Sequence, residues 1–501
     1  MRRQAPHPPE ADSSAAAERR QALHPPEADS SAAAECRRHF KWLQLPQISF
    51  LLSLHPQMNQ SLPSYRKIWD ISLPIILSLV AQNVVNVTDT AFLGRVGEVE
   101  LGASALAGLF YVSLFMLGFG FGIGAQILIA RRNGEQNYRE IGSITDNSLY
   151  FLTFLGLILF LIIRFFSPYM LRPIIASDAV YRASLDFLQY RIYGLFFAYA
   201  NVLLRSFYIG TTNTRVLTYN AVIMAVVNVF LDYAMIFGHF GFPAMGIKGA
   251  AIASVIAEMV SAVYFFIYTF RRVNLHHFNL FRFGRMDLKV VQSTLKVSIF
   301  VMLQYFLSLA SWFVFFMIIE KMGERPLAIS NIIRSAYIVL MIPVFAFGST
   351  TNSLVSNVIG QGKPEFVIPV IKRVALMNFI LIGSIILISA FIPHLLISIY
   401  TSDPELINMT VRPFYVVMSA LFLFSFSSIM FNGVSGTANT QTALLIETIT
   451  IVLYLAATWL LAVRLKLSIE LVWTSEYVYG LVLSLLSFYY LKSGKWRKKV
   501  I

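Results

Sequence analysis

The stretch IWDISLPIILSLVAQNVVNVTDTAFL, residues 68–93, decides the class of fold. As a helix rising about 1.5 Å per residue, it is long enough to cross the hydrocarbon core of a bilayer. Its only charged residues are Asp70, near its beginning, and Asp89, inside it. Because an ionisable side chain is costly inside a membrane, we expect Asp89 to have a function or a well-placed partner.

The composition of the whole chain extends this interpretation. Hydrophobic residues make up 57% of the 501 residues and charged residues only 13%, which is typical of a protein that crosses the membrane many times. The formal charge of +14 comes from Lys and Arg at the ends of apolar runs, so no nucleic-acid partner is predicted. The expected partners are the lipid bilayer and a small-molecule substrate, and the protein is expected to be a monomer.

No cofactor is predicted. The single cysteine excludes an intramolecular disulfide, and the eight histidines show no metal-ligand spacing.

Apolar runs separated by short polar connections continue to the end of the chain. They predict an all-α membrane protein with twelve transmembrane helices in two pseudo-symmetric six-helix lobes. The predicted spans are 68–93, 103–130, 142–164, 181–206, 216–238, 247–270, 291–320, 327–358, 368–395, 409–433, 440–463 and 468–491.

An internal repeat supports the two lobes. The motif GTTNT at 210–214 returns as GTANT at 436–440, and Gly134 after span two corresponds to Gly362 after span eight. A duplication of six spans gives both halves the same orientation. The predicted parts are an N-terminal extension (1–57), an N-lobe (58–270), a cytoplasmic linker (271–290) and a C-lobe with a basic tail (291–501).

The extension contains RRQAPHPPEADSSAAAE at 2–18, followed by an almost identical copy at 19–35. Such a composition predicts disorder. Either the native chain starts at Met58, or the extension is a regulatory tail. Lys and Arg are enriched at the two ends and after even-numbered spans, so both termini are predicted to face the cytoplasm. The expected location is the inner membrane of a prokaryote.

Polar residues of the first lobe form the candidate site. Gln82 and Asn86 lie on the helix face of Asp89, and Asn228 and Asp232 are four residues apart on one face of span five. The corresponding positions of the second lobe carry no charge. A purely structural Asp89, bonded to Asn86 and Thr90, is the alternative.

Ser254 in span six is predicted at a similar depth to Asp89 and Asp232. Glu258, one turn further along, is interpreted either as a proton relay or ligand, or as the ion-pair partner of Arg191. In the second lobe, Arg334 is predicted to pair with Glu447 or Glu476, with a substrate contact as the alternative.

The twelve spans, the duplicated lobes and the motifs VTDTAFLG, ARRNG, GTTNT, GTANT and NVFLD resemble the MATE (multidrug and toxic compound extrusion) transporters of the MOP superfamily. Within that family the chain resembles the DinF-like branch. This resemblance implies an N-lobe ion site formed by Asp89, Asn228, Asp232 and Ser254, with H⁺ or Na⁺ as the coupling ion. A Na⁺ ion at Asp89, Asn228 and Asp232 is the only metal that it implies. The resemblance also implies a hinge at Pro74, for which a static kink is the alternative.

NorM-like members have an acid in span seven, where this chain has Gln304, so a C-lobe cation site of that type is not expected. The sequence therefore predicts a transporter without catalytic residues. Its expected activity is H⁺- or Na⁺-coupled antiport, which exports small, cationic or lipophilic compounds by alternating access. The alternatives are a lipid-linked oligosaccharide flippase and, in another class, an intramembrane aspartyl protease, although no GxGD motif occurs.

Overall fold

The computed structural model describes residues 62–498, in which every regular element is a helix. The predicted extension at 1–57 and the proposed start at Met58 lie outside the described residues. The helices of the first half are α3 (Tyr65–Val96), α4 (Glu98–Gly134), α5 (Tyr138–Leu171), α6 (Asp178–Arg191), α7 (Gly194–Gly210), α8 (Arg215–Phe237) and α9 (Ile247–Arg272).

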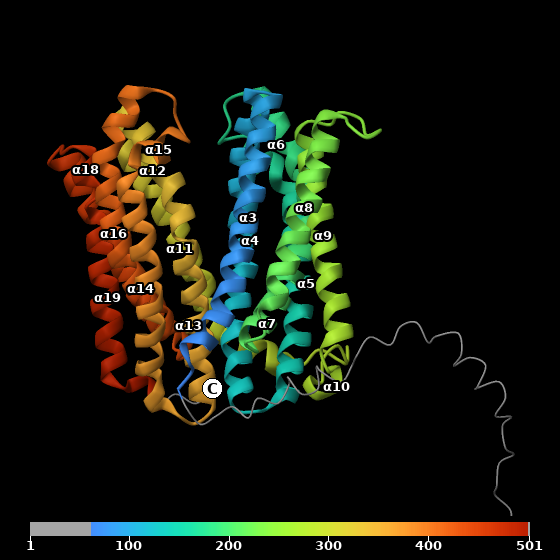
Figure 1. Cartoon of the computed structure of the whole chain (residues 1–501). Coiled ribbons are helices and arrows are strands. Elements are labelled where there is room, and N and C mark those ends of the chain that lie inside the picture. The colour runs from blue at the N-terminus through green and yellow to red at the C-terminus, as the bar shows by residue number, and fades with distance from the viewer. Residues whose placement is uncertain (1–61, 499–501) are drawn as a thin grey trace, which may run out of the picture. The chain divides into compact units, whose positions relative to one another are not determined.

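The second half follows a short helix, α10 (Leu275–Phe278), and contains α11 (Leu288–Glu320), α12 (Glu324–Leu340), α13 (Ile342–Gly360), α14 (Val367–Phe391), α15 (Pro393–Ser398), α16 (Pro404–Gly436), α17 (Thr440–Trp459), α18 (Ile469–Val472) and α19 (Ser475–Ser493). Short helical turns at Pro364–Phe366, Leu460–Arg464 and Lys495–Lys498 complete it. Figure 1 shows α3 to α9, blue to green, grouped beside one another, and α11 to α19, yellow to red, grouped likewise. We call these groups the N-lobe and the C-lobe.

Two of the predicted spans are broken. The fourth consists of α6 and α7, which meet at 53°, and the eighth consists of α12 and α13, which meet at 44°. When each bent pair counts as one span, the described residues contain up to twelve helical spans long and apolar enough to cross a membrane. The fold class predicted from the sequence is therefore confirmed, although the two breaks were not predicted.

The connection between the lobes is fixed to α5. The carboxylate of Asp146 accepts hydrogen bonds from the backbone N–H groups of Phe281 and Arg282, at 2.9 and 3.0 Å. Asn147 accepts another from the N–H of Asp287, which in turn caps the start of α11. These bonds satisfy backbone donors that a loop would otherwise leave to water.

The lobes meet along α3, α4, α11 and α13, and we call this contact the interlobe seam. Its contacts are reciprocal. A Cβ atom on Gly134 would lie 2.0 Å from the backbone oxygen of Asn357, and one on Gly360 would lie 2.1 Å from that of Arg131. Residues 131 and 357, like 134 and 360, are 226 positions apart, which is also the offset of the GTTNT and GTANT turns.

A second reciprocal pair of contacts joins α3 to α13 and α11 to α4. Ser72 donates to Thr350 Oγ1 at 2.9 Å, while Ser298 packs so closely on Gly124 that a Cβ there would lie 2.0 Å from its hydroxyl oxygen. Residues 72 and 298, and 124 and 350, again differ by 226. A self-complementary contact of this kind is what twofold-related copies of one unit form. The contacts therefore pair Gly134 with Gly360 rather than with Gly362.

The seam occupies one end of the helices. It uses the beginning of α3 and the end of α4, and the start of α3 lies at the same end as the C-terminus of the chain (Figure 1). Asp89 lies near the C-terminal end of α3, and Asp232 lies near the C-terminal end of α8. Both residues are therefore far from the beginning of α3, where the seam lies. The lobes are thus joined at one membrane face, and the carboxylates lie towards the other.

The close approach at the seam predicts the effect of one methyl group. Gly134→Ala should force α4 away from α13 and destabilise this arrangement by about 1–3 kcal/mol, because backbone rather than a flexible side chain fills the space. We expect a lower melting temperature in detergent. Gly108→Ala on the same helix is the control, since no atom lies within 4 Å of its Cβ position. Equal melting temperatures for the two variants would contradict the prediction.

Candidate functional site

The carboxyl groups of Asp89 on α3 and Asp232 on α8 contact each other within the N-lobe. Asp232 is fully buried and Asn228, one turn earlier on α8, is 1% exposed. Asp89 is half-buried, with its Oδ1 atom out of contact with water. The structure thus brings together the three residues that the sequence placed in one cluster.

This cluster lacks ordinary hydrogen-bond partners. Among the described residues, no donor bonds to Asp89 Oδ1 or to either carboxylate oxygen of Asp232, and the amide of Asn228 lies beside Asp232 without a regular hydrogen bond. Two ionised carboxylates in contact repel each other, and a proton or a cation between them removes the repulsion. The arrangement suits a site that takes up a small positive charge.

The other predicted members contribute less directly. Ser254 and Gln82 are half-buried and Asn86 is exposed. None of the three forms a hydrogen bond to the carboxylates within residues 62–498. The structural alternative for Asp89 is not formed either, because Thr90 donates to the backbone oxygen of Asn86 at 2.8 Å instead of to the carboxylate.

Glu258 is paired with Arg191. The guanidinium donates from Nη1 to Oε2 at 2.8 Å and from Nη2 to Oε1, and it lies 4.0 Å from the centre of the Tyr111 ring. Of the two interpretations of Glu258, the structure supports the second one, in which Glu258 is the ion-pair partner of Arg191. Arg191 also acts electrostatically on Asp89 and Asp232, so it is a positive charge near the cluster that is already neutralised by Glu258.

The sequence did not predict that Gly194 leaves room for this ion pair. Arg191 is the last residue of α6, at the break before α7, and a Cβ atom on Gly194 would lie 2.3 Å from both Arg191 Nη1 and Glu258 Oε2. The Arg191-x-x-Gly194 spacing inside an apolar span was the available signal. The contact of Arg191 with the ring of Tyr111, which lies on α4, could not be predicted from the sequence.

Pro74 lies in the first half of α3, which continues unbroken through it. Thr218 of α8 donates to the backbone oxygen of Pro74 at 3.3 Å, and Thr214 donates to that of Ile71 at 2.9 Å. Threonine side chains of α8 therefore hold α3 at this position. The hinge remains a proposal.

The predicted ion pair of the C-lobe is wrong. Arg334 is exposed on α12, where it bonds to Asn331 and lies 5.2 Å from the centre of the Phe316 ring. Glu447 and Glu476 are buried and accept hydrogen bonds from Ser308 and tyrosine hydroxyl groups instead. The error arose because the sequence gives the span of Arg334 but not the direction in which its side chain points.

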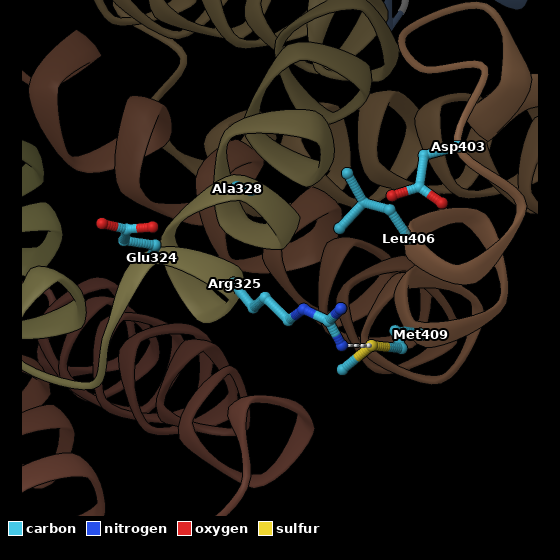
Figure 2. Close-up of a pocket in the computed structure, with 6 residues that line it drawn as sticks. All are labelled: Glu324, Arg325, Ala328, Asp403, Leu406 and Met409. Carbon is cyan, nitrogen blue, oxygen red and sulfur yellow. Dashed lines mark hydrogen bonds between the residues drawn. The ribbon is translucent and has the colours of Figure 1, made fainter.

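A small surface pocket lies apart from these groups. It is formed between the first turns of α12 and α16, where Arg325 pairs with Glu405 and approaches the sulfur atom of Met409 (Figure 2). Both charged side chains of this pair are more than half exposed. An exposed pair contributes little to stability, and nothing connects the pocket to the buried carboxylates.

The family model described as MatE matches the chain twice, over residues 74–234 and 299–460. The two matches cover more than half of the chain. The chain belongs to the MatE family. The two matches cover corresponding parts of the N-lobe and the C-lobe. This agrees with the reciprocal contacts at the seam.

Curated relatives of this MatE protein share low identity over most of their length. A "Probable multidrug resistance protein NorM" of Thermotoga maritima is 25% identical over 448 residues, which cover 88% of this chain and 96% of the relative. A "Probable multidrug resistance protein YoeA" of Bacillus subtilis is 23% identical over 441 residues, covering 86% and 93%. The chain is thus a transporter and not an enzyme, and the resemblance stated from its motifs is confirmed at the level of the family.

Solved structures share the fold. An outward-facing multidrug resistance MATE family transporter of the MOP superfamily superposes with a TM-score of 0.81 at 15% identity, covering 86% of this chain and 96% of the other. A MOP superfamily transporter from Pyrococcus furiosus gives 0.79 at 16% identity, covering 88% and 98%. The assignment to the DinF-like branch stays a prediction.

The pair of Arg191 and Glu258 generates a test of stability. Glu258→Gln should cost about 3 kcal/mol or more, because it leaves a buried guanidinium without its carboxylate. Unfolding in a denaturing detergent should report the loss. The double variant Arg191→Gln with Glu258→Gln should recover most of it, since neither charge then remains. If Glu258→Gln alone is as stable as the parent protein, the ion pair does not hold α6 to α9.

Proposed function

We propose that this MatE protein exports small organic compounds in exchange for protons or sodium ions that bind between Asp89 and Asp232. The names of its relatives support the export of compounds. The observation that carries the coupling is the contact of two carboxyl groups, one of them fully buried, with no regular hydrogen bond from the described residues to Asp89 Oδ1 or to either oxygen of Asp232. Asn228 and Ser254 are proposed to complete the coordination of the ion.

The exchange follows from the charge of the pair. When the site is empty, repulsion between the carboxylates favours an arrangement in which α3 and α8 separate or admit water. A proton or a sodium ion removes the repulsion and favours close packing of the N-lobe. Because the site lies towards the membrane face opposite to the seam, ions from outside can drive the change, and each inward charge gains about 2.3 kcal/mol per 100 mV.

The substrate is proposed to be a lipophilic or cationic compound. An interior rich in phenylalanine and tyrosine offers apolar burial and attraction between a cation and aromatic ring faces. The flippase alternative needs a strongly cationic interior for an anionic sugar. Arg191 is neutralised by Glu258 and Arg334 is exposed on α12, so neither residue supports that alternative.

The proposed location is the inner membrane of a prokaryote, with both termini in the cytoplasm and the protein acting as a monomer. The bacterial relatives support the location. The distribution of Lys and Arg supports the cytoplasmic position of both termini. The seam then lies on the cytoplasmic side, and the present arrangement is closed to the cytoplasm.

The coupling ion is tested with inverted membrane vesicles. A fluorescent organic cation should accumulate in the vesicles when a pH gradient or a sodium gradient is imposed, and imposing each gradient alone identifies the ion. Vesicles without the protein are the control. Absence of gradient-driven accumulation for a range of cations and neutral lipophiles would refute the proposal.

The sharpest test of the site is Asp89→Asn, which keeps the size and the hydrogen-bonding capacity of the side chain but cannot ionise. The variant should insert and fold normally, because it removes a charge from an apolar environment. It should lose gradient-driven export by at least about tenfold, equivalent to about 1.4 kcal/mol of coupling. Gln304→Ala in the C-lobe should retain most of the activity. Equal export by Asp89→Asn and the parent at matched membrane levels would return Asp89 to a structural role.

A further inference from the structure

Glu447 is a buried carboxylate for which the proposed exchange has no use. It lies on α17 and is 3% exposed. Ser308 of α11 and Tyr479 of α19 donate hydrogen bonds to its Oε1 atom, at 2.8 and 2.7 Å. No described donor bonds to Oε2. Two hydroxyl groups from neighbouring helices therefore orient this carboxylate and leave one oxygen atom without a donor.

A second carboxylate lies further along the same lobe. Glu476, in the first turn of α19, is 7% exposed. The hydroxyl of Tyr337 donates to it at 3.5 Å, and the hydroxyl of Tyr454 also faces it. Tyr454 is two helical turns from Glu447, about 10 Å along α17. Tyrosine hydroxyl groups thus line the C-lobe from one glutamate towards the other.

The aromatic rings make this a packed group. The rings of Tyr454 and Tyr479 meet edge to face with centroids 5.6 Å apart, and Phe424 of α16 lies 5.9 Å from Tyr479. Tyr454 also stacks on the buried ring of Phe315. Packing of this kind fixes the hydroxyl groups, so the contacts to the carboxylates belong to the fold of the lobe.

No basic residue neutralises either glutamate. Within residues 62–498 neither forms an ion pair, and Arg334 lies on an exposed surface. The groups that face Glu447 are Ser308 and Tyr305 on α11 and Tyr479 on α19, with Glu476 beyond them. Arg205, across the lobes on α7, acts electrostatically on Tyr305. Burying a carboxylate as an ion costs far more than burying the neutral acid when no cation compensates it.

The helices that hold this group are the counterparts of those that hold the first site. Asp89, Asp232 and Ser254 belong to the first, fifth and sixth spans of the N-lobe, and Ser308, Glu447 and Tyr479 belong to the first, fifth and sixth spans of the C-lobe. The residues themselves are not copies, because the position 226 after Asp232 is Thr458. Each lobe therefore carries carboxylates between the same three spans, but at different positions.

We propose that Glu447 is a second proton-binding site, in the C-lobe, with Glu476 as the next acceptor along the tyrosine hydroxyl groups. The inference rests on the proposed ion-driven exchange. The proton comes from water and adds to Oε2, the charge of the carboxylate changes from −1 to 0, and Oε1 keeps both hydrogen bonds. A proton suits this site better than a metal ion, because the two hydroxyl groups direct their hydrogen atoms, and not their lone pairs, towards the carboxylate.

The test uses infrared difference spectra of the purified full-length protein in lipid, recorded between about pH 5 and about pH 9. A carbonyl stretching band of a protonated carboxylic acid should appear and disappear with pH, and Glu447→Gln should remove it. Glu320→Gln, at the exposed end of α11, is the matched control and should leave the band unchanged. A spectrum of Glu447→Gln identical to that of the parent over the whole range would overturn the proposal.

Three further measurements keep the test independent of folding and of transport. Tyr479→Phe keeps the ring and the carboxylate, so the band should remain but its midpoint should move; an unmoved midpoint would contradict the role of the hydroxyl group. A band that responds to sodium at constant pH, and not to pH, would replace the proton by a metal ion. In Asp89→Asn the Glu447 band should persist, so that a failure of the N-lobe site and a failure of this one give different spectra.

Discussion

The absence of water from the hydrocarbon core is the constraint on which this structure depends. Every backbone N–H and C=O group there needs a partner within the protein, so each span is a helix or a pair of helices joined at a bend. The same constraint makes charged side chains rare. Among the described residues, Arg191 and Glu258 compensate each other, whereas Asp89, Asp232, Glu447 and Glu476 form no ion pair with a basic side chain.

Contacts between the lobes follow from the same constraint. Because lipid chains are as apolar as leucine, helices associate in a membrane through close packing and hydrogen bonds instead of the hydrophobic effect. The seam uses both means. Glycines at 124, 134 and 360 admit the backbone of the partner helix, and Ser72 and Thr350 bond across the lobes. The seam therefore combines close backbone packing and a hydrogen bond with apolar contacts, such as that between the rings of Trp69 and Phe347.

Much of this fold could be predicted from the sequence, because the length of an apolar run reports a span directly. The breaks at residues 192–193 and at Met341 could not be predicted from the same signal, since the apolar composition continues across them. Pro343 at the start of α13 was the available clue, because a proline disfavours a helical conformation in the residue before it.

The candidate site was predictable only in part. Asp89, Asn228 and Asp232 stood out because polar residues are rare in apolar spans, and the helical period placed them on defined faces. The partner of Arg334 was predicted wrongly, because charge alone does not say which way a side chain points. The tyrosines around Glu447 and Glu476 were missed for a different reason. In a chain with 23 tyrosines, a hydroxyl that bonds to a carboxylate looks no different from one that faces lipid headgroups.

The helix α3 connects the two ends of this arrangement. Ser72 at its beginning belongs to the seam, and Asp89 near its end belongs to the carboxylate pair. Thr218 of α8 bonds to the backbone oxygen of Pro74, between these points, and Thr214, directly before α8, bonds to that of Ile71. Since proline leaves one carbonyl of the helix without its usual donor, this segment is where α3 can bend at least cost. In the proposed exchange, a change in charge at Asp89 and Asp232 would alter the packing of α3 on α8, and the same helix would carry that change to Ser72 and the contact with the C-lobe.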